Sequence, residues 1–263
     1  MTVGPTTFIK ELAFNTTDKS GFEAAKSIAK NADVVVMVLG EHGFQSGEGR
    51  SRTNLDLPGN QQELLEEIFK VNKNIVLVLN NGRPLTIPWA SEHIPAIVEA
   101  WQLGTQTGNA VAQVLYGDYN PSGKLPMSFP RNVGQVPIYY NNYSTGRPVD
   151  SDKNVFWSHY SDVEKTPLYP FGHGLSYTTF KYDNLQLNKV SFAKGEPVKI
   201  SVTVSNTGKY DGKEVVQLYI RDLAGSLSRP VKELKGFELI SLKKGETKTV
   251  HFTLTEAELG FYD

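Results

Sequence analysis

The sequence predicts an open α/β sheet followed by an all-β sandwich of the immunoglobulin-like or fibronectin type III-like kind. In the first part of the chain, helix-like and apolar strand-like segments alternate, which is typical of a parallel sheet with helical crossovers. In the last part, apolar residues recur at every second position, the period of half-buried strands. A long stretch rich in Tyr, Pro and Asn separates the two. We therefore expect an α/β domain at 1–132, an aromatic-rich inter-domain loop at 133–174 and a β-sandwich domain at 175–263.

Six segments build the predicted α/β region. The segment DKSGFEAAKSIAKNA predicts a helix with Phe22 and Ala29 on one face, capped by Asp18 or Ser20. The run DVVVMVLG is continuously apolar, which predicts a parallel strand buried on both faces. The remaining segments are expected to form two helices, at 57–72 and 105–117, and two strands, at 74–82 and 94–102.

The predicted β-sandwich contains about five strands. They alternate apolar and polar residues and are separated by turns that mostly contain glycine, at 180–190, 196–208, 212–222, 229–242 and 246–254. A sandwich of the immunoglobulin kind has about seven strands. We therefore expect an incomplete sandwich, truncated at its C-terminal end.

Composition excludes several classes of function. The chain carries 27 basic and 28 acidic residues, a balance that argues against nucleic acid or an anionic membrane surface as a partner. There is no cysteine, hence no disulfide, thiolate metal site or cysteine nucleophile. The stretch GDYNPSGKL resembles a phosphate loop, but five residues separate Gly117 from Gly123 and Leu125 replaces the magnesium-binding hydroxyl. No H-x-x-x-H or G-x-S-x-G motif occurs. We expect no cofactor and no metal.

The loop GEHGFQSGEGRSRTNLDLPGNQ directly follows a predicted strand and is unusually long and charged. In an open α/β sheet, ligands bind beyond the carboxyl ends of the strands, which is where this loop lies. Its glycines allow close backbone approach to a ligand. Glu41 and Glu48 are either two solvated acids or groups with a chemical role, and residue types alone leave both interpretations open.

Several long motifs, found in order along the chain, carry a more specific resemblance. SGEGRSRTNLDLPGNQQELL, NIVLVLNNGRPLTIPW, EAWQLGTQTGNAVAQVLYGDYNPSGKLPMSFP and LYPFGHGLSYTTF resemble the C-terminal parts of family 3 glycoside hydrolases, of the bacterial periplasmic β-glucosidase type. The resemblance implies a (β/α) barrel, an α/β sandwich domain and a fibronectin type III-like domain. The barrel has no counterpart here, so we expect a fragment whose α/β sandwich domain is truncated at its N-terminal end.

The resemblance also implies roles for residues of the loop. The family's general acid/base matches Glu48, whereas Glu41, directly after the strand, matches less well. The nucleophile is an aspartate of the barrel, and we expect no nucleophile in this chain. Retaining hydrolysis requires the two carboxyl groups to lie roughly 5–5.5 Å apart, so the loop must reach another domain. The residues expected on the substrate side are His42, Phe44, Arg50, Arg52 and Trp157.

The implied activity is that of a retaining, exo-acting β-glycosidase that hydrolyses β-linked glucosides. The isolated chain is expected to be inactive, with the barrel domain or a second chain as its partner, and the resemblance implies a periplasmic or secreted location. The alternative is a non-catalytic carbohydrate-binding or adhesion module that uses Trp157, Tyr139, Tyr140 and Tyr143. Without a barrel to pack on, the loop at 43–52 is expected to be mobile and Glu48 exposed.

Overall fold

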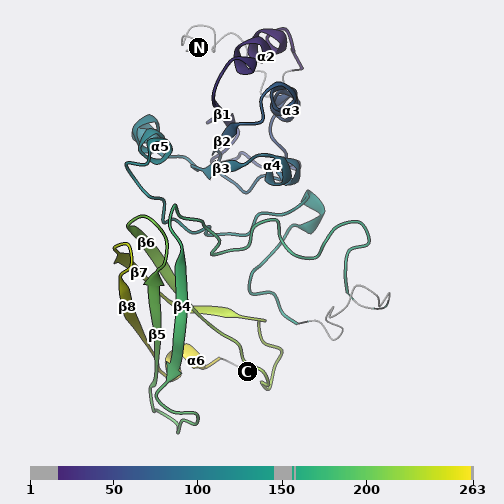
Figure 1. Cartoon of the computed structure of the whole chain (residues 1–263). Helices are drawn as coiled ribbons and strands as arrows, with labels where there is room; N and C mark the ends of the chain where they lie inside the picture. Colours follow the sequence, from purple (N-terminus) through teal and green to yellow (C-terminus); the bar gives the residue numbers. More distant parts are fainter. Residues whose placement is uncertain (1–16, 145–155, 157, 262–263) are drawn as a thin grey trace. The chain divides into compact units, whose positions relative to one another are not determined.

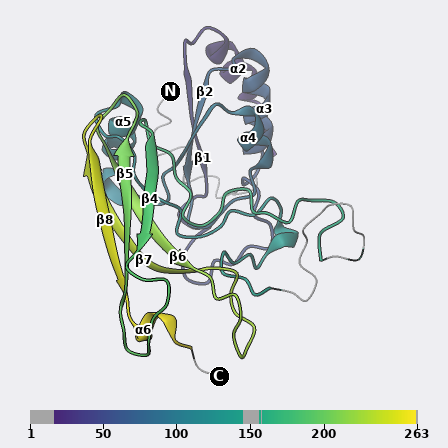
Figure 2. The same cartoon turned by 60° about the horizontal axis from the view of Figure 1, so that its bottom comes forward.

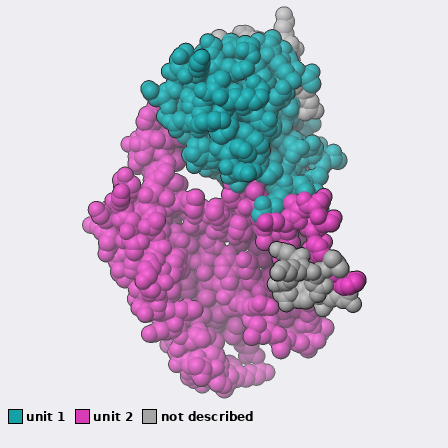
Figure 3. All heavy atoms as spheres, turned by 45° about the vertical axis from the view of Figure 1, so that its right-hand side comes forward, with its two compact units in different colours: residues 1–111, 129–136 teal, residues 112–128, 137–263 magenta. Residues whose placement is uncertain are grey.

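The computed structural model describes residues 17–144, 156 and 158–261 (Figure 1). The chain divides into two compact units: residues up to 111 together with 129–136, and residues 112–128 together with those from 137 onward (Figure 3). The division into domains at 1–132, 133–174 and 175–263 stays a prediction.

A parallel three-stranded sheet in the order β1-β2-β3 forms the centre of the first unit. Helices α2, α3 and α4 lie on one side of it (Figures 1 and 2). The elements are α2 (Phe22–Lys30), β1 (Val35–Gly40), α3 (Gln61–Val71), β2 (Ile75–Asn80), α4 (Pro88–His93) and β3 (Ala96–Glu99). The predicted α/β region is confirmed.

The core of this unit includes residues of the central strand and of α3. Ile75 and Leu77 of β2 are fully buried, as is Leu65 of α3, while Ile68 is almost so. β2 is paired on both edges, which is why its apolar run has little contact with solvent.

Three local details differ from the sequence expectations. The N-cap of α2 is Gly21, and the Asp18 carboxylate instead accepts a hydrogen bond from the Ser20 amide, so neither expected side chain caps the helix. Helix α4 was not predicted, because six residues are too few to show an amphipathic period. It begins at Pro88, a residue favoured at the first helical position since it has no amide hydrogen to leave unpaired.

The prediction that β1 is buried on both faces is wrong. Met37 is buried, but Val36 and Val38 are 47% and 62% exposed. β1 is an edge strand of the sheet. Its two-sided apolar sequence therefore has a cover on only one face in the described part of the chain.

The second unit contains the predicted antiparallel strands in two sheets, of order β4-β5-β8 and β6-β7. Val204 and Val250 from the first sheet pack with Val216, Ile240 and Leu242 from the second. The strands are β4 (Phe180–Leu187), β5 (Val198–Asn206), β6 (Gly212–Ile220), β7 (Glu233–Leu242) and β8 (Thr247–Leu254). All five predicted strands, and the fold class, are confirmed.

Two further helices complete the regular structure. α5 (Thr107–Tyr116) confirms the helix expected at 105–117, and its sequence runs across the division between the units at residue 111. The short helix α6 (Glu256–Leu259) begins with a capping box formed by Thr255 and Glu258. Among the described residues, no helix has the length and hydropathy that a membrane span requires.

Candidate functional site

Polar side chains gather at the carboxyl edge of the parallel sheet. Glu41 follows β1, Asn81 follows β2, and Glu99 is the last residue of β3. Glu41 and Asn81 are buried and Glu99 is half-buried. This is the edge at which open α/β sheets bind ligands, and the long loop starts from it.

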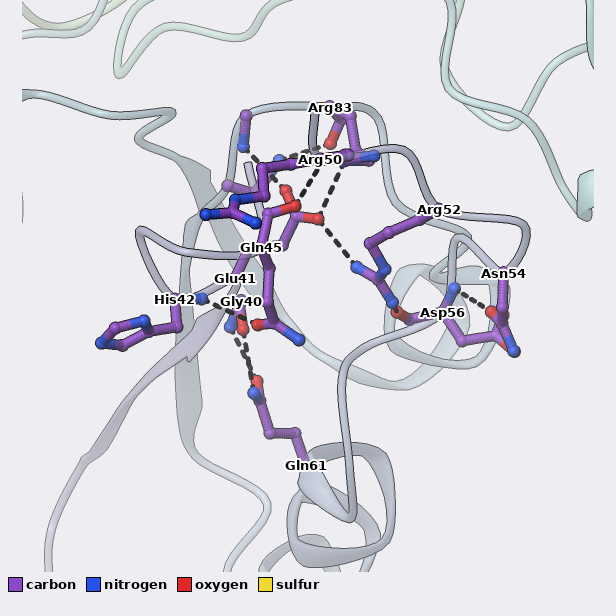
Figure 4. Close-up of polar contacts among 12 residues, drawn as sticks. Gly40, Glu41, His42, Gln45, Arg50, Arg52, Asn54, Asp56, Gln61 and Arg83 are labelled. Atoms are coloured by element: carbon purple, nitrogen blue, oxygen red, sulfur yellow. Dashed lines mark hydrogen bonds and ion pairs between the residues drawn. The ribbon is translucent and has the colours of Figure 1, made fainter. Parts of the chain in front are cut away.

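Glu41 is held by two arginines (Figure 4). Its Oε1 accepts a hydrogen bond of 2.8 Å from Nη1 of Arg52, and Nε of Arg83 lies 2.9 Å from the same oxygen in an ion pair. Its Oε2 accepts a hydrogen bond of 3.0 Å from the Gly82 amide. The carboxylate side chain has no accessible surface. Such a burial of charge is tolerable only because both oxygens are paired.

Arg83 also holds the loop itself. Its Nη2 donates to the carbonyl of Gln45 at 2.6 Å and to the carbonyl of Arg50 at 2.8 Å. Glu48 lies between these two attachment points in the sequence. The guanidinium thus connects the end of the sheet with both arms of the loop.

The second arm of the loop has anchors of its own. Nη2 of Arg52 donates to the carbonyl of Asp56 at 2.9 Å. Thr86 donates its amide to the carbonyl of Leu55 at 2.9 Å, and its hydroxyl to the carboxylate of Asp56. The return of the chain toward α3 is therefore fixed on the segment that follows β2.

The first arm starts from a position that only glycine can occupy. Gly40 has a φ of +132°, and a Cβ there would lie 2.2 Å from the carbonyl oxygen of Asn80. The side chain of Gln61 pairs with both backbone groups of Gly40, its Oε1 accepting at 2.7 Å and its Nε2 donating at 2.8 Å. The Gln61 side chain thus makes the hydrogen bonds that a neighbouring strand would make with the end of the edge strand β1.

Glu48 lies at the exposed tip of the loop. The Arg50 amide donates to the Gly47 carbonyl at 3.1 Å, which closes a turn around Glu48 and Gly49. Gly49 has a φ of +67°, as the third residue of a type II turn requires. Within the described residues, the Glu48 side chain makes no hydrogen bond or ion pair. The predicted exposure of Glu48 is confirmed, while the mobility of the loop stays a prediction.

The other predicted substrate-side residues lie at different places. His42 and Phe44 share the first arm, with ring centroids 5.4 Å apart. The Arg50 side chain is exposed. Arg52 is bonded to the buried Glu41 and to the carbonyl of Asp56, and a direct role toward a substrate stays a prediction. Trp157 lies outside the described residues.

In the alternative of a carbohydrate-binding module, exposed aromatic rings would stack on sugars, and not all of the expected rings are exposed. Tyr139 and Tyr143 are exposed, whereas the Tyr140 ring is stacked on Phe171 with centroids 4.2 Å apart. Tyr140 is therefore partly covered by the protein itself. Sugar stacking on these rings stays a prediction.

Glu99 has an unusual environment for a carboxyl group. Its Oε1 accepts a hydrogen bond of 2.9 Å from the amide of Trp101, a residue held at a φ of +48°, and Oε2 lies 3.4 Å from Nδ2 of Asn81. Burial raises the pKa of Glu99 to about 7, because it disfavours the charged form, while these two hydrogen bonds lower the pKa by less.

Sequence reasoning missed the role of Arg83, Asn81 and Gln61. The segment NNGRP, which follows the apolar part of β2, contains two of these residues, Asn81 and Arg83. The available signal was position, because Asn81 to Arg83 follow a strand neighbouring the one that carries the loop. Across the described parts of the chain, no three His, Cys, Asp or Glu side chains are grouped to hold a metal ion.

Comparisons with known proteins identify two domain families in the chain. The glycosyl hydrolase family 3 C-terminal domain matches residues 2–177, and the fibronectin type III-like domain matches 214–263. The periplasmic beta-glucosidase of Salmonella typhimurium is 49% identical over 92% of this chain and 32% of its own length. A beta-xylosidase of Formosa agariphila is 52% identical over the same shares.

A solved structure has the same fold. The beta-glucosidase of Listeria innocua in complex with glucose matches with a TM-score of 0.91 and 41% identity, over 95% of this chain and 35% of the other. The chain spans about a third of the length of the relatives that it matches. The family model covers most of the chain, and the chain therefore belongs to glycoside hydrolase family 3, of which it carries the C-terminal domain and a fibronectin type III-like domain.

Proposed function

We propose that this chain supplies the general acid/base, Glu48, of a retaining, exo-acting β-glycosidase that hydrolyses β-linked glucosides. One observation carries the proposal: among the described residues Glu48 has no partner, and it lies at the exposed tip of a loop whose two arms are attached to the carboxyl edge of the sheet. A group that must first give a proton to the leaving oxygen and then take one from water needs such a free carboxyl group.

Glu41 is unsuited to this role, although it is the other acid of the loop. Both of its oxygens are paired, and its side chain has no accessible surface. A substrate oxygen could reach this carboxylate only by displacing a guanidinium group from it. Glu48 is thus the better candidate on geometry as well as on resemblance.

The nucleophile is proposed to come from a barrel domain, in the same protein or on a second chain. Its carboxylate would stand roughly 5–5.5 Å from that of Glu48, the spacing of a retaining enzyme. The 263-residue chain by itself is then inactive on glycosides, since it holds half of the carboxylate pair.

The names of the relatives support the proposed substrate class and location. The similar proteins are named as a periplasmic beta-glucosidase and a beta-xylosidase, and a structure of the Listeria innocua protein contains laminaribiose. These names support β-linked glucosides as substrates, with β-xylosides as the closest competitor. They also support a periplasmic or secreted protein.

The test compares hydrolysis of an aryl β-glucoside and of cellobiose by the chain alone and by the chain preceded by a family 3 barrel domain. We expect turnover only in the second case. There, Glu48→Gln should lower kcat/KM for cellobiose by about 10²- to 10⁴-fold. The control Glu63→Gln removes an exposed carboxylate of the same unit and should leave turnover unchanged. Turnover by the chain alone that disappears in Glu48→Gln contradicts the proposal that the nucleophile comes from a barrel domain.

The alternative of a non-catalytic carbohydrate-binding module gives a different result in the same system. It requires sugar affinity without a barrel, and calorimetric titration of the chain alone with cellobiose measures this. The proposed function requires only weak binding. Tight binding that is lost in Tyr139→Ala or Tyr143→Ala favours the module.

A further inference from the structure

We infer that Arg83, Glu41 and Arg52 are positioning residues that set the place of Glu48 in the active site. This inference rests on the proposed function for its catalytic consequence, but the attachment of the loop is visible in the chain itself. Arg83 is the central member, because it touches Glu41 and both arms of the loop (Figure 4).

Arg83 attaches both arms of the loop. The carbonyls of Gln45 and Arg50 both bind the same nitrogen of Arg83, at 2.6 and 2.8 Å. They flank the turn that carries Glu48. A loop with polar residues and three glycines at 43–49 has few apolar contacts with which to hold its own shape. These two hydrogen bonds therefore restrict the directions in which the turn can extend.

The three charged side chains are largely covered. The side chains of Arg52 and Arg83 are 17% and 19% exposed, and that of Glu41 is fully covered. Water competes little for the bonds of the fully covered Glu41 carboxylate, and charge-assisted bonds there are correspondingly strong. Glu41 thereby fixes the orientation of the Arg83 guanidinium, and the oriented guanidinium in turn fixes the loop.

The planar shape of the guanidinium suits both of its contacts. Arg83 uses Nε toward Glu41 and Nη2 toward the loop carbonyls, so one rigid plane serves both contacts. A lysine keeps the positive charge, but its single ammonium group cannot reproduce this geometry. Arg83→Lys therefore keeps the positive charge that neutralises Glu41, which the fold requires, but loses the bonds that orient the loop carrying Glu48.

The first measurement is made on the full 263-residue chain and needs no activity. A glutamyl endopeptidase cleaves after an accessible Glu48, and mass spectrometry identifies the cut. We expect cleavage after Glu48 in Arg83→Lys to be about tenfold faster than in the wild type, because the arms of the loop are released. The control is Arg229→Lys, a substitution at a similarly covered ion pair with Glu233 in the other unit. It should leave this rate unchanged.

The second measurement uses the chain preceded by a family 3 barrel domain. Cellobiose has a poor leaving group and requires the proton of Glu48, whereas a dinitrophenyl glucoside hardly does. We expect Arg83→Lys to lower kcat/KM for cellobiose by about 10- to 100-fold, the effect of a misplaced catalytic group, and to preserve it for the dinitrophenyl glucoside. A role in folding alone would lower both equally.

The outcomes separate the possibilities. Faster cleavage with a selective loss on cellobiose supports the inference. Unchanged cleavage, or equal losses on both substrates, overturns it. If Arg83→Lys is poorly folded, Gln45 and Arg50 can still be released by Arg83→Gln in a Glu41→Gln background. This removes the paired charges of Arg83 and Glu41 together and leaves that of Arg52, and the same selectivity is expected. A wild-type protein without turnover, in which cleavage still depends on Arg83, contradicts the proposed function and leaves the attachment of the loop standing.

Discussion

The Arg52 guanidinium lies 2.8 Å from the carboxylate of Glu41, eleven residues earlier in the chain. The ion pair joins the beginning of the loop to its second arm, and Glu48 stands between the two. Arg83 adds a connection from the segment after β2. The loop is therefore long in sequence but closed near its base.

Breaking this pair should destabilise the first unit. Glu41→Gln leaves the guanidinium groups of Arg52 and Arg83 without a carboxylate in a covered site. We expect the free energy of unfolding to fall by roughly 3 kcal/mol, as for other buried pairs that lose one partner. Urea denaturation of the chain, followed by circular dichroism, measures the change.

The matched control for that substitution is Glu63→Gln. Glu63 pairs with Lys19 at 2.6 Å, but the two side chains are 47% and 52% exposed. An exposed pair contributes at most about 1 kcal/mol. Equal effects of the two substitutions would show that the Glu41 cluster is an ordinary surface network.

Gly40→Ala should be among the most damaging single changes in the α/β unit. Its φ of +132° is costly for alanine, and the new Cβ would lie 2.2 Å from the backbone oxygen of Asn80. We expect a loss of at least about 2 kcal/mol of unfolding free energy.

Gly108 offers the comparison for this glycine. It lies within α5, and an added Cβ would meet no atom within 4 Å. Gly108→Ala should therefore stabilise the chain by up to about 1 kcal/mol, the difference in helix propensity. Thermal unfolding of both variants gives the result, and a Gly40→Ala protein as stable as the wild type contradicts the described backbone.

Glu99 should make stability fall as the pH rises. Its pKa lies near 4.5 in the unfolded chain and is raised to about 7 in the folded chain. Between these values the folded state binds more protons than the unfolded one, so the unfolding free energy decreases with rising pH and levels off above about 7. The full contribution is roughly 3 kcal/mol, since each unit of pKa corresponds to about 1.4 kcal/mol.

The variant Glu99→Gln isolates this effect from other titrating groups. Glutamine retains an oxygen to accept from the Trp101 amide but carries no charge. The difference in unfolding free energy between variant and wild type should grow in favour of the variant from pH 5 to pH 8. A difference that does not depend on pH contradicts the raised pKa.

The sequence predicts the fold in detail because its two periods are clear. The alternation in the strands at 198–206 and 247–254 marks a face that packs inward, and the structure places Val204 and Val250 there. The burial of β1 was mispredicted. An apolar run shows that a strand is compatible with burial on both faces, but it does not show that other elements pack against both of them. Val36 and Val38 are the residues that reveal the difference.

The candidate site was predictable only in part. Glu48 follows from a motif within one segment, SGEGRSR. The partners of Glu41 could not be predicted in this way, because Arg83 is 42 residues away along the chain and meets it through the pairing of β1 with β2. Long-range contacts of this kind depend on strand order, which residue spacing does not contain.

The most direct test of the account is chemical rescue of Glu48→Ala in the protein that combines this chain with a family 3 barrel domain. Without its acid/base, the enzyme should form a glucosyl-enzyme from a dinitrophenyl glucoside and release it slowly. Azide, which needs no base to attack, should restore turnover and yield β-glucosyl azide with retained configuration. A folded Glu48→Ala protein that hydrolyses cellobiose at the wild-type rate, or that azide does not rescue, contradicts the assignment of Glu48.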